Sequence, residues 1–197
     1  MQQFGANELG YGALNQSLTQ AAPDGSMEAP MDIFTIGYEG AHIDAFVATL
    51  AAAGVETLVD VRAVAVSRRP GFSKTALGLR LTAEGIRYVH LRDLGDPKPG
   101  REAARAGRFR AFERIYDAHL ATPAAVDALA EAGRLAGQSP IALMCFEADA
   151  SHCHRTVIAR RLAKAMKLLI VDLRVNNPGA AFGARAISHS GEGLAAA

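Results

Sequence analysis

Short apolar runs alternate along the chain with longer stretches whose apolar residues recur every three to four positions. The apolar runs are rich in Val, Ile and Leu, which is typical of buried strands. They predict five strands, at residues 33–36, 55–61, 86–91, 141–146 and 168–173. The helical periodicity lies between them and predicts helices at residues 44–50, 75–84, 109–120, 124–135 and 152–166.

This alternation predicts the fold class. Apolar strands separated by helices form a mostly parallel sheet that is covered on both faces and has right-handed crossovers. We therefore expect an α/β fold: a three-layer αβα domain with about five strands, over residues 32–175. Residues 1–31 and 176–197 are rich in small and polar residues without a sustained period, and we expect a flexible N-terminal extension and a flexible C-terminal tail.

The composition narrows the cellular setting. Half of the 197 residues are hydrophobic, but no apolar run is long enough to span a membrane. The first 30 residues contain no Lys or Arg and no apolar central block, so they do not resemble a secretory signal. We expect a cytoplasmic protein without a membrane partner, in which Cys145 and Cys153 are reduced thiols.

The net charge of +1 conceals an asymmetry. Residues 1–61 carry 8 acids and no Lys or Arg, whereas residues 62–197 hold all 21 basic residues and the other 12 acids. Within residues 62–114, 13 Lys and Arg face 5 acids. This surplus favours an anionic partner, either a small molecule or a nucleic acid. A solvated helix face with charged loops is the alternative interpretation.

Polar residues follow four of the five predicted strands. In a parallel sheet the carboxyl ends of the strands meet at one edge, where ligands bind. We expect a shared site there that contains Tyr38 and Glu39, Asp60 and Arg62, His90, and Cys145 and Glu147. The loop 67–74 adds Arg68 and Lys74 beside a Pro-Gly turn, a composition that suits either an anion or a simple helix cap.

Three interpretations compete for the segment 141–155. In the first, Cys153 lies in the first turn of a helix beside His154 and Arg155, where the dipole and the cations lower its thiol pKa and make it a nucleophile. A strand-end nucleophile at Cys145, as in rhodanese-like and cysteine phosphatase domains, is a fold-level analogy only, because the loop has no glycine.

The second interpretation is a metal site built from Cys145, Cys153 and one of His152, His154 or His90, with a carboxylate nearby, and these ligand types suit zinc. The spacing speaks against it, because paired-cysteine zinc motifs place their thiolates about two to four residues apart. In addition, consecutive helical residues such as Cys153 and His154 diverge by about 100 degrees. The third interpretation is structural, with Cys145 as a buried apolar residue and Arg155 paired with Glu147 or Asp149.

Several motifs taken together resemble the domain of unknown function family 488. They are Thr-Ile-Gly-Tyr-Glu-Gly at 35–40, Asp-Val-Arg at 60–62, residues 67–74, Tyr-Val-His-Leu at 88–91 with Leu-Gly at 94–95, Cys-Phe-Glu at 145–147 and Cys-His-Arg at 153–155. The resemblance covers about residues 33–172. It implies a soluble α/β domain whose motif residues share a site, and it supplies no established reaction.

The sequence favours an enzyme that acts on a phosphorylated or nucleotide-containing substrate. Its expected catalytic residues are Glu39, Asp60, His90, Cys145, Glu147, Cys153 and His154, and its expected substrate-binding residues are Tyr38, Arg62, Arg68, Lys74 and Arg155. The alternatives are a nucleic-acid-binding module without catalysis and a metal or redox thiol protein. No cofactor, metal ligand set or oligomeric state is assigned from the sequence.

Overall fold

A computed structural model describes residues 32–151 and 153–176. These residues form a five-stranded sheet in the order β3-β2-β4-β1-β5, in which every pair of neighbours is parallel. The strands are β1 Ile33–Gly37, β2 Thr57–Asp60, β3 Arg87–His90, β4 Ile141–Cys145 and β5 Ile170–Leu173. The predicted terminal extensions lie outside the described residues, apart from residue 176.

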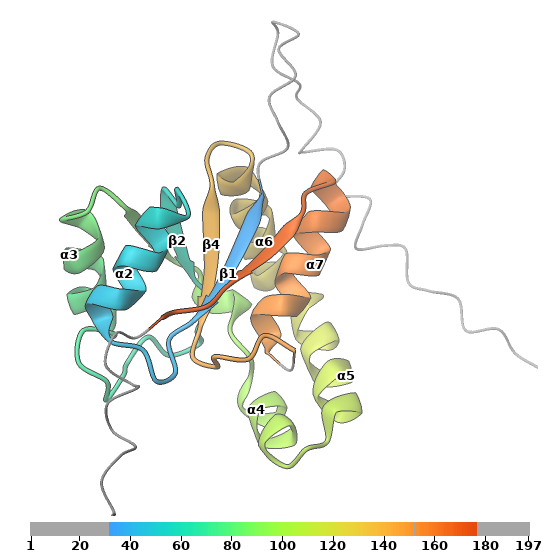
Figure 1. Ribbon diagram of the computed structural model, residues 1–197. Helices are drawn as coiled ribbons and strands as arrows, with labels where there is room; N and C mark the ends of the chain where they lie inside the picture. Colours follow the sequence, from blue (N-terminus) through green and yellow to red (C-terminus); the bar gives the residue numbers. More distant parts are fainter. Residues whose placement is uncertain (1–31, 152, 177–197) are drawn as a thin grey trace, which may run out of the picture.

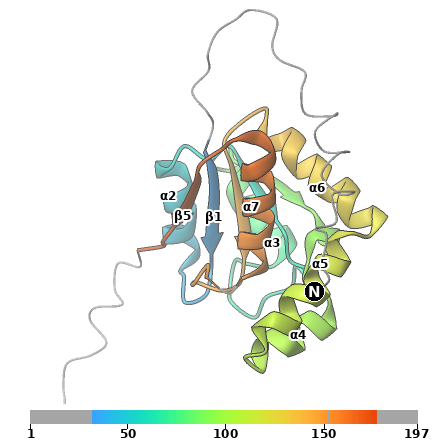
Figure 2. The same ribbon diagram turned by 90° about the vertical axis from the view of Figure 1, so that its right-hand side faces the viewer.

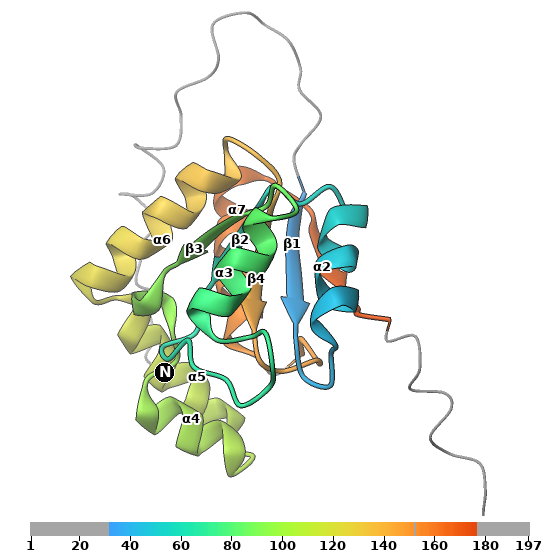
Figure 3. The same cartoon turned by 90° about the vertical axis from the view of Figure 1, so that its left-hand side faces the viewer.

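Helices cover both faces of the sheet, so the predicted three-layer α/β fold is confirmed (Figures 1, 2 and 3). Figure 3 looks onto the layer formed by α2 (Ile43–Ala52) and α3 (Lys74–Thr82). The opposite layer, which faces the viewer in Figure 2, holds α5 (Phe109–Leu120), α6 (Pro123–Ala136) and α7 (His154–Met166). No helix among the described residues is long and apolar enough to cross a membrane.

Successive side chains of β4 point to opposite faces of the sheet, so they pack against different helix layers. Ile141 and Leu143 pack into the cluster that includes α5, α6 and α7, whereas Ala142 and Met144 pack into the cluster that includes α2 and α3. All four side chains are at most 1% exposed. A strand that is buried on both faces explains why this segment is an uninterrupted apolar run in the sequence.

One helix was not predicted. Helix α4, Lys98–Arg105, follows a 3-10 turn at Arg92–Leu94 and packs against α5 beyond the carboxyl ends of the strands (Figure 1). Pro99 and Gly100 in its first turn conceal the helix from periodicity analysis. Proline is tolerated there because the first helical N–H groups need no partner within the helix.

Candidate functional site

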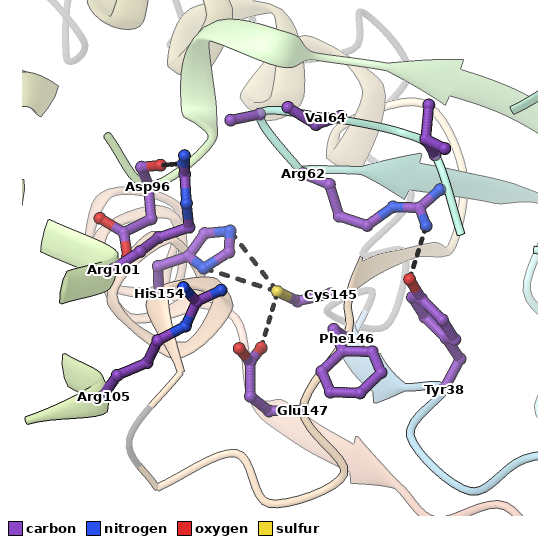
Figure 4. A pocket seen from close by; sticks show the side chains of 12 residues that line it. Tyr38, Arg62, Val64, Asp96, Arg101, Arg105, Cys145, Phe146, Glu147 and His154 are labelled. Carbon is purple, nitrogen blue, oxygen red and sulfur yellow. Dashed lines mark hydrogen bonds between the residues drawn. The ribbon is translucent and has the colours of Figure 1, made fainter. Parts of the chain in front are cut away.

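A cavity of about 270 Å³ lies at the edge where β1, β2 and β4 end. The cavity is formed by the residues that follow β1 and β2, by the end of β4 and the loop after it, by the start of α7, and by α4. Its lining residues are Tyr38, Arg62, Ala63, Val64, Val66, Asp96, Arg101, Arg105, Cys145, Phe146, Glu147 and His154. Figure 4 shows the Cys145 sulfur between the His154 ring and the Glu147 carboxylate, with Arg101 and Arg105 projecting from α4.

Close backbone contact fixes the loop that carries Glu147. The Tyr38 N–H donates to the Cys145 carbonyl at 3.3 Å, which joins the segments that follow β1 and β4. A Cβ atom at Gly37 would lie 1.8 Å from the Glu147 carbonyl oxygen. Only glycine allows this approach, so Gly37 sets the position of Glu147.

Two thiols and an imidazole surround the Glu147 carboxylate. The Cys145 and Cys153 thiols donate to Glu147 Oε2 at 2.9 and 3.2 Å, and Cys145 Sγ lies 3.5 Å from His154 Nδ1. His154 Nε2 lies 2.9 Å from the Val61 carbonyl oxygen. One ligand-type atom from each of Cys145, Glu147, Cys153 and His154 lies within 4.8 Å of the other three.

The environment keeps both thiols protonated. Burial raises the pKa of Cys145, and burial together with the neighbouring Cys145 thiol raises the pKa of Cys153 well above its usual value. Burial opposes ionisation of Glu147, but hydrogen bonds from Cys145 and Cys153 outweigh it and lower the Glu147 pKa. Burial likewise opposes protonation of His154, but contact with Cys153 outweighs it and raises the His154 pKa.

These findings correct the predicted placement of Cys153 in the first turn of a helix, and burial with a raised thiol pKa does not support an activated nucleophile. Cys153 is the N-cap of α7, not a member of its first turn, and it is only 3% exposed. Its backbone is extended, with φ −102° and ψ 142°. The same geometry removes the objection from helical divergence, because Cys153 and His154 are not consecutive helical residues and each places a ligand atom in the same cluster. His152, a further metal ligand weighed from the sequence, lies outside the described residues.

Asp60 and Arg62 form a buried ion pair beside the cavity. Arg62 Nη2 lies 2.6 Å from Asp60 Oδ2, which also accepts a hydrogen bond from the Tyr88 hydroxyl at 2.5 Å. Burial opposes the charge of Arg62, but Asp60 outweighs it and raises the Arg62 pKa. Burial and the charge of Asp60 raise the Tyr88 pKa. Arg62 also donates to the Tyr38 hydroxyl at 2.8 Å, so the pair connects the end of β2 with β3 and with the residue after β1.

Arg155 holds the loop after β4 through hydrogen bonds to its backbone. Its side chain is fully buried, and its guanidinium donates to the Glu147 carbonyl and, at 3.2 Å, to the Ala148 carbonyl. Its acidic partner is Asp172, at 3.5 Å, and not the carboxylate of Glu147 or Asp149 that the structural interpretation expected. Arg155 therefore holds the 147–148 loop in place instead of facing the cavity.

Seven expected site residues do not line the cavity, and two of them, Cys153 and Arg155, are described above. Asp60 is buried in its ion pair, and His90 Nε2 bonds the Arg62 carbonyl at 2.8 Å. The Glu39 carboxylate accepts from the Ala148 N–H at 3.1 Å, Lys74 begins α3, and Arg68 lines a neighbouring groove. The ends of the strands do meet at one edge, but their side chains turn toward different surroundings.

Among the seven cavity residues that the expected site did not include, three are charged: Asp96, Arg101 and Arg105. Asp96 is 6% exposed, burial raises its pKa to about 6, and its Oδ1 has no hydrogen-bond partner among the described residues. A Cβ atom at Gly100 would lie 2.1 Å from that oxygen, so the glycine makes room for the carboxylate. The i, i+4 spacing of the two arginines after Pro97 was the signal that could have revealed α4.

Comparison with known proteins identifies a family but no activity. No curated protein and no solved structure matches the chain. The family model described as domain of unknown function DUF488 matches residues 42–162, which include β2, β3 and β4 and every cavity residue except Tyr38. The match covers more than half of the 197 residues, and the chain therefore belongs to the DUF488 family.

Proposed function

We propose that the chain is an enzyme that acts on a small phosphorylated substrate at the carboxyl edge of the sheet. One observation carries the proposal: two arginines of α4 line the same cavity as a buried cluster of thiols, imidazole and carboxylate. Guanidinium groups bind phosphate oxygens through charge-assisted hydrogen bonds. The cavity of about 270 Å³ lies near the lower end of the size range of small-molecule sites.

Arg101 and Arg105 are the arginines available to an anion. The charge of Arg62 is already balanced by Asp60. Among the described residues, by contrast, no carboxylate forms an ion pair with Arg101 or Arg105, and Arg101 donates only to the uncharged Asp96 carbonyl. Asp96 interacts with Arg101 electrostatically, and Arg105 has no ion-pair partner among the described residues, so a phosphate group would bring further negative charge to both.

Asp96 supports a substrate that also carries a proton donor. Asp96 lines the cavity, and a carboxylate there can accept a hydrogen bond from a hydroxyl or amino group of a substrate. Its Oδ1 is buried against Gly100, so the other carboxylate oxygen, Oδ2, would be the acceptor. Sugar phosphates and nucleotides combine such a group with a phosphate, and Val64, Val66 and Phe146 offer apolar contacts beside it, being 61%, 74% and 44% exposed.

The catalytic step would fall to the groups nearest Cys145. Cys145, Glu147 and His154 all line the cavity, so a substrate held by Arg101 and Arg105 would meet this cluster. Both cysteines are free thiols, which is typical of a protein in a reducing compartment.

Binding of inorganic phosphate and of a panel of phosphate esters tests the proposal by calorimetry. We expect Arg101→Ala and Arg105→Ala each to weaken binding about 10- to 100-fold, because a hydrogen bond to a charged group contributes about 1.5–3 kcal/mol. Arg110→Ala is the matched control, because Arg110 is exposed and does not line the cavity. Equal weakening by Arg110→Ala, or no binding of any phosphorylated compound to the wild type, would contradict the proposal.

A second candidate function, nucleic-acid binding, has an observation of its own. A shallow groove lined by Arg68, Arg69 and Phe146 adjoins the cavity and shares Arg105 with it. A single strand bound there would place phosphates on the arginines and stack a base on Phe146. Binding of a labelled oligonucleotide, measured by fluorescence anisotropy, should then weaken steeply as the salt concentration rises. Binding should also be weaker in the Phe146→Ala variant. The absence of binding at low salt would exclude this candidate.

A further inference from the structure

The cluster at the end of β4 has the donor set of a transition-metal site. Its atoms are the two sulfurs of Cys145 and Cys153, a ring nitrogen of His154 and a carboxylate oxygen of Glu147, all within 4.8 Å of one another. Thiolate, imidazole and carboxylate are the ligands that zinc takes in proteins, commonly four at a time. Magnesium and calcium prefer sites made of oxygen alone.

The orientation of His154 suits coordination. A carbonyl oxygen can only accept, so the 2.9 Å contact between His154 Nε2 and the Val61 carbonyl places the proton of a neutral ring on Nε2. Nδ1 is then left with a free lone pair, and it is the ring nitrogen nearer to Cys145 Sγ, at 3.5 Å. Histidines that bind metals usually donate their other N–H to a carbonyl or carboxylate in this way.

The distances suit a tetrahedron. With zinc–sulfur and zinc–nitrogen bonds of about 2.3 and 2.0–2.1 Å, neighbouring sulfur and nitrogen ligands lie about 3.6 Å apart. The Cys145–His154 distance of 3.5 Å matches this edge. Glu147 Oε2 lies 2.9 and 3.2 Å from the two sulfurs. If this oxygen moves away from the sulfurs by less than about 1 Å, it reaches the distance that a tetrahedral zinc site requires.

We propose that Cys145, Glu147, Cys153 and His154 bind one tetrahedral zinc ion at the wall of the cavity. Binding replaces the two thiol protons that Glu147 accepts in the metal-free protein, and these protons pass to the solvent. The two thiolates and the carboxylate then carry three negative charges against the two positive charges of zinc. The net charge of −1 lies in the same cavity as Arg101 and Arg105. The metal site does not depend on the identity of the substrate.

Metal binding by the full-length protein tests the proposal directly. The reduced protein is stripped with a chelator, dialysed against Zn²⁺ or Co²⁺, and analysed for metal by mass spectrometry. We expect about one ion per chain. The cobalt form should show the intense ligand-field bands of a tetrahedral centre and thiolate-to-cobalt charge-transfer bands.

Variants locate the site. Cys153→Ser and His154→Gln should each weaken zinc binding about 100-fold or more in competition with a chromophoric chelator. His90→Gln is the matched control, because His90 also bonds a backbone carbonyl but lies outside the cluster, and it should bind zinc as the wild type does. If a variant fails to fold, the wild-type cobalt spectrum decides alone. Six-coordinate cobalt without thiolate bands, or wild-type protein that holds no zinc after dialysis, would overturn the proposal.

Discussion

Replacing Asp60 with asparagine should strongly destabilise the protein, although Asp60 itself does not line the cavity. The carboxylate is fully buried and accepts from Arg62 Nε at 2.8 Å and Nη2 at 2.6 Å, and from the Tyr88 hydroxyl at 2.5 Å. The Asp60→Asn variant keeps the size of the side chain but leaves the Arg62 guanidinium buried without its counter-charge. Breaking a buried pair in this way costs about 3–5 kcal/mol.

Unfolding in urea, followed by circular dichroism at pH 7, measures this loss of free energy of unfolding. In thermal unfolding, 1 kcal/mol corresponds to about 2–4 °C for a domain of this size, so the melting temperature should fall by about 6–20 °C. The control is Glu84→Gln, which breaks the exposed pair between Glu84 and Arg80 and should cost no more than about 0.5 kcal/mol. A loss below about 1 kcal/mol in Asp60→Asn would refute the view that Asp60 chiefly balances the charge of Arg62.

Two further substitutions test the packing of the site and its electrostatics. Gly37→Ala should cost more than about 2 kcal/mol, because its Cβ would lie 1.8 Å from the Glu147 carbonyl oxygen. Gly54→Ala, which has open space but φ +69°, should cost only about 1 kcal/mol, and equal losses in urea unfolding would count against the close approach. Folding raises the Asp96 pKa from 3.8 to about 6, so the folded state holds this proton more tightly and its ionised form costs stability above pH 6. Asp96→Asn should therefore be more stable than the wild type at pH 7.5, with a difference that shrinks between pH 6 and 4; a difference independent of pH would disprove this origin.

The fold was readable from the sequence because the strands are buried on both faces. Such strands appear as plain apolar runs, and all five predicted strands overlap those of the structure. The predicted helix at residues 109–120 has the bounds of α5. Helix α4 was missed because Pro99 and Gly100 occupy its first turn. For this reason Asp96, Arg101 and Arg105 were not expected to line the site.

The grouping of the site residues depended on side-chain directions that strand ends do not determine. Asp60, Cys145 and His90 all end parallel strands, yet only Cys145 lines the cavity. Two arguments from the sequence oppose the metal hypothesis: the wide spacing of the two cysteines and the assignment of Cys153 to the helix. The structure removes the second. A shift of the helix start to His154 turns Cys153 into an extended N-cap and brings its sulfur beside Glu147. Boundary errors of one or two residues thus change which chemistry a segment allows.

Untargeted mass spectrometry of a cell extract tests the central claim, that this cavity transforms a phosphorylated substrate, most directly. The extract is incubated with wild-type protein supplied with zinc, and in parallel with Arg105→Ala and Glu147→Gln. We predict that at least one phosphorylated compound is consumed and a product appears with the wild type, while both variants leave that compound largely unchanged. An extract in which folded wild-type protein changes no phosphorylated compound, or in which the variants act as fast as the wild type, would contradict the claim.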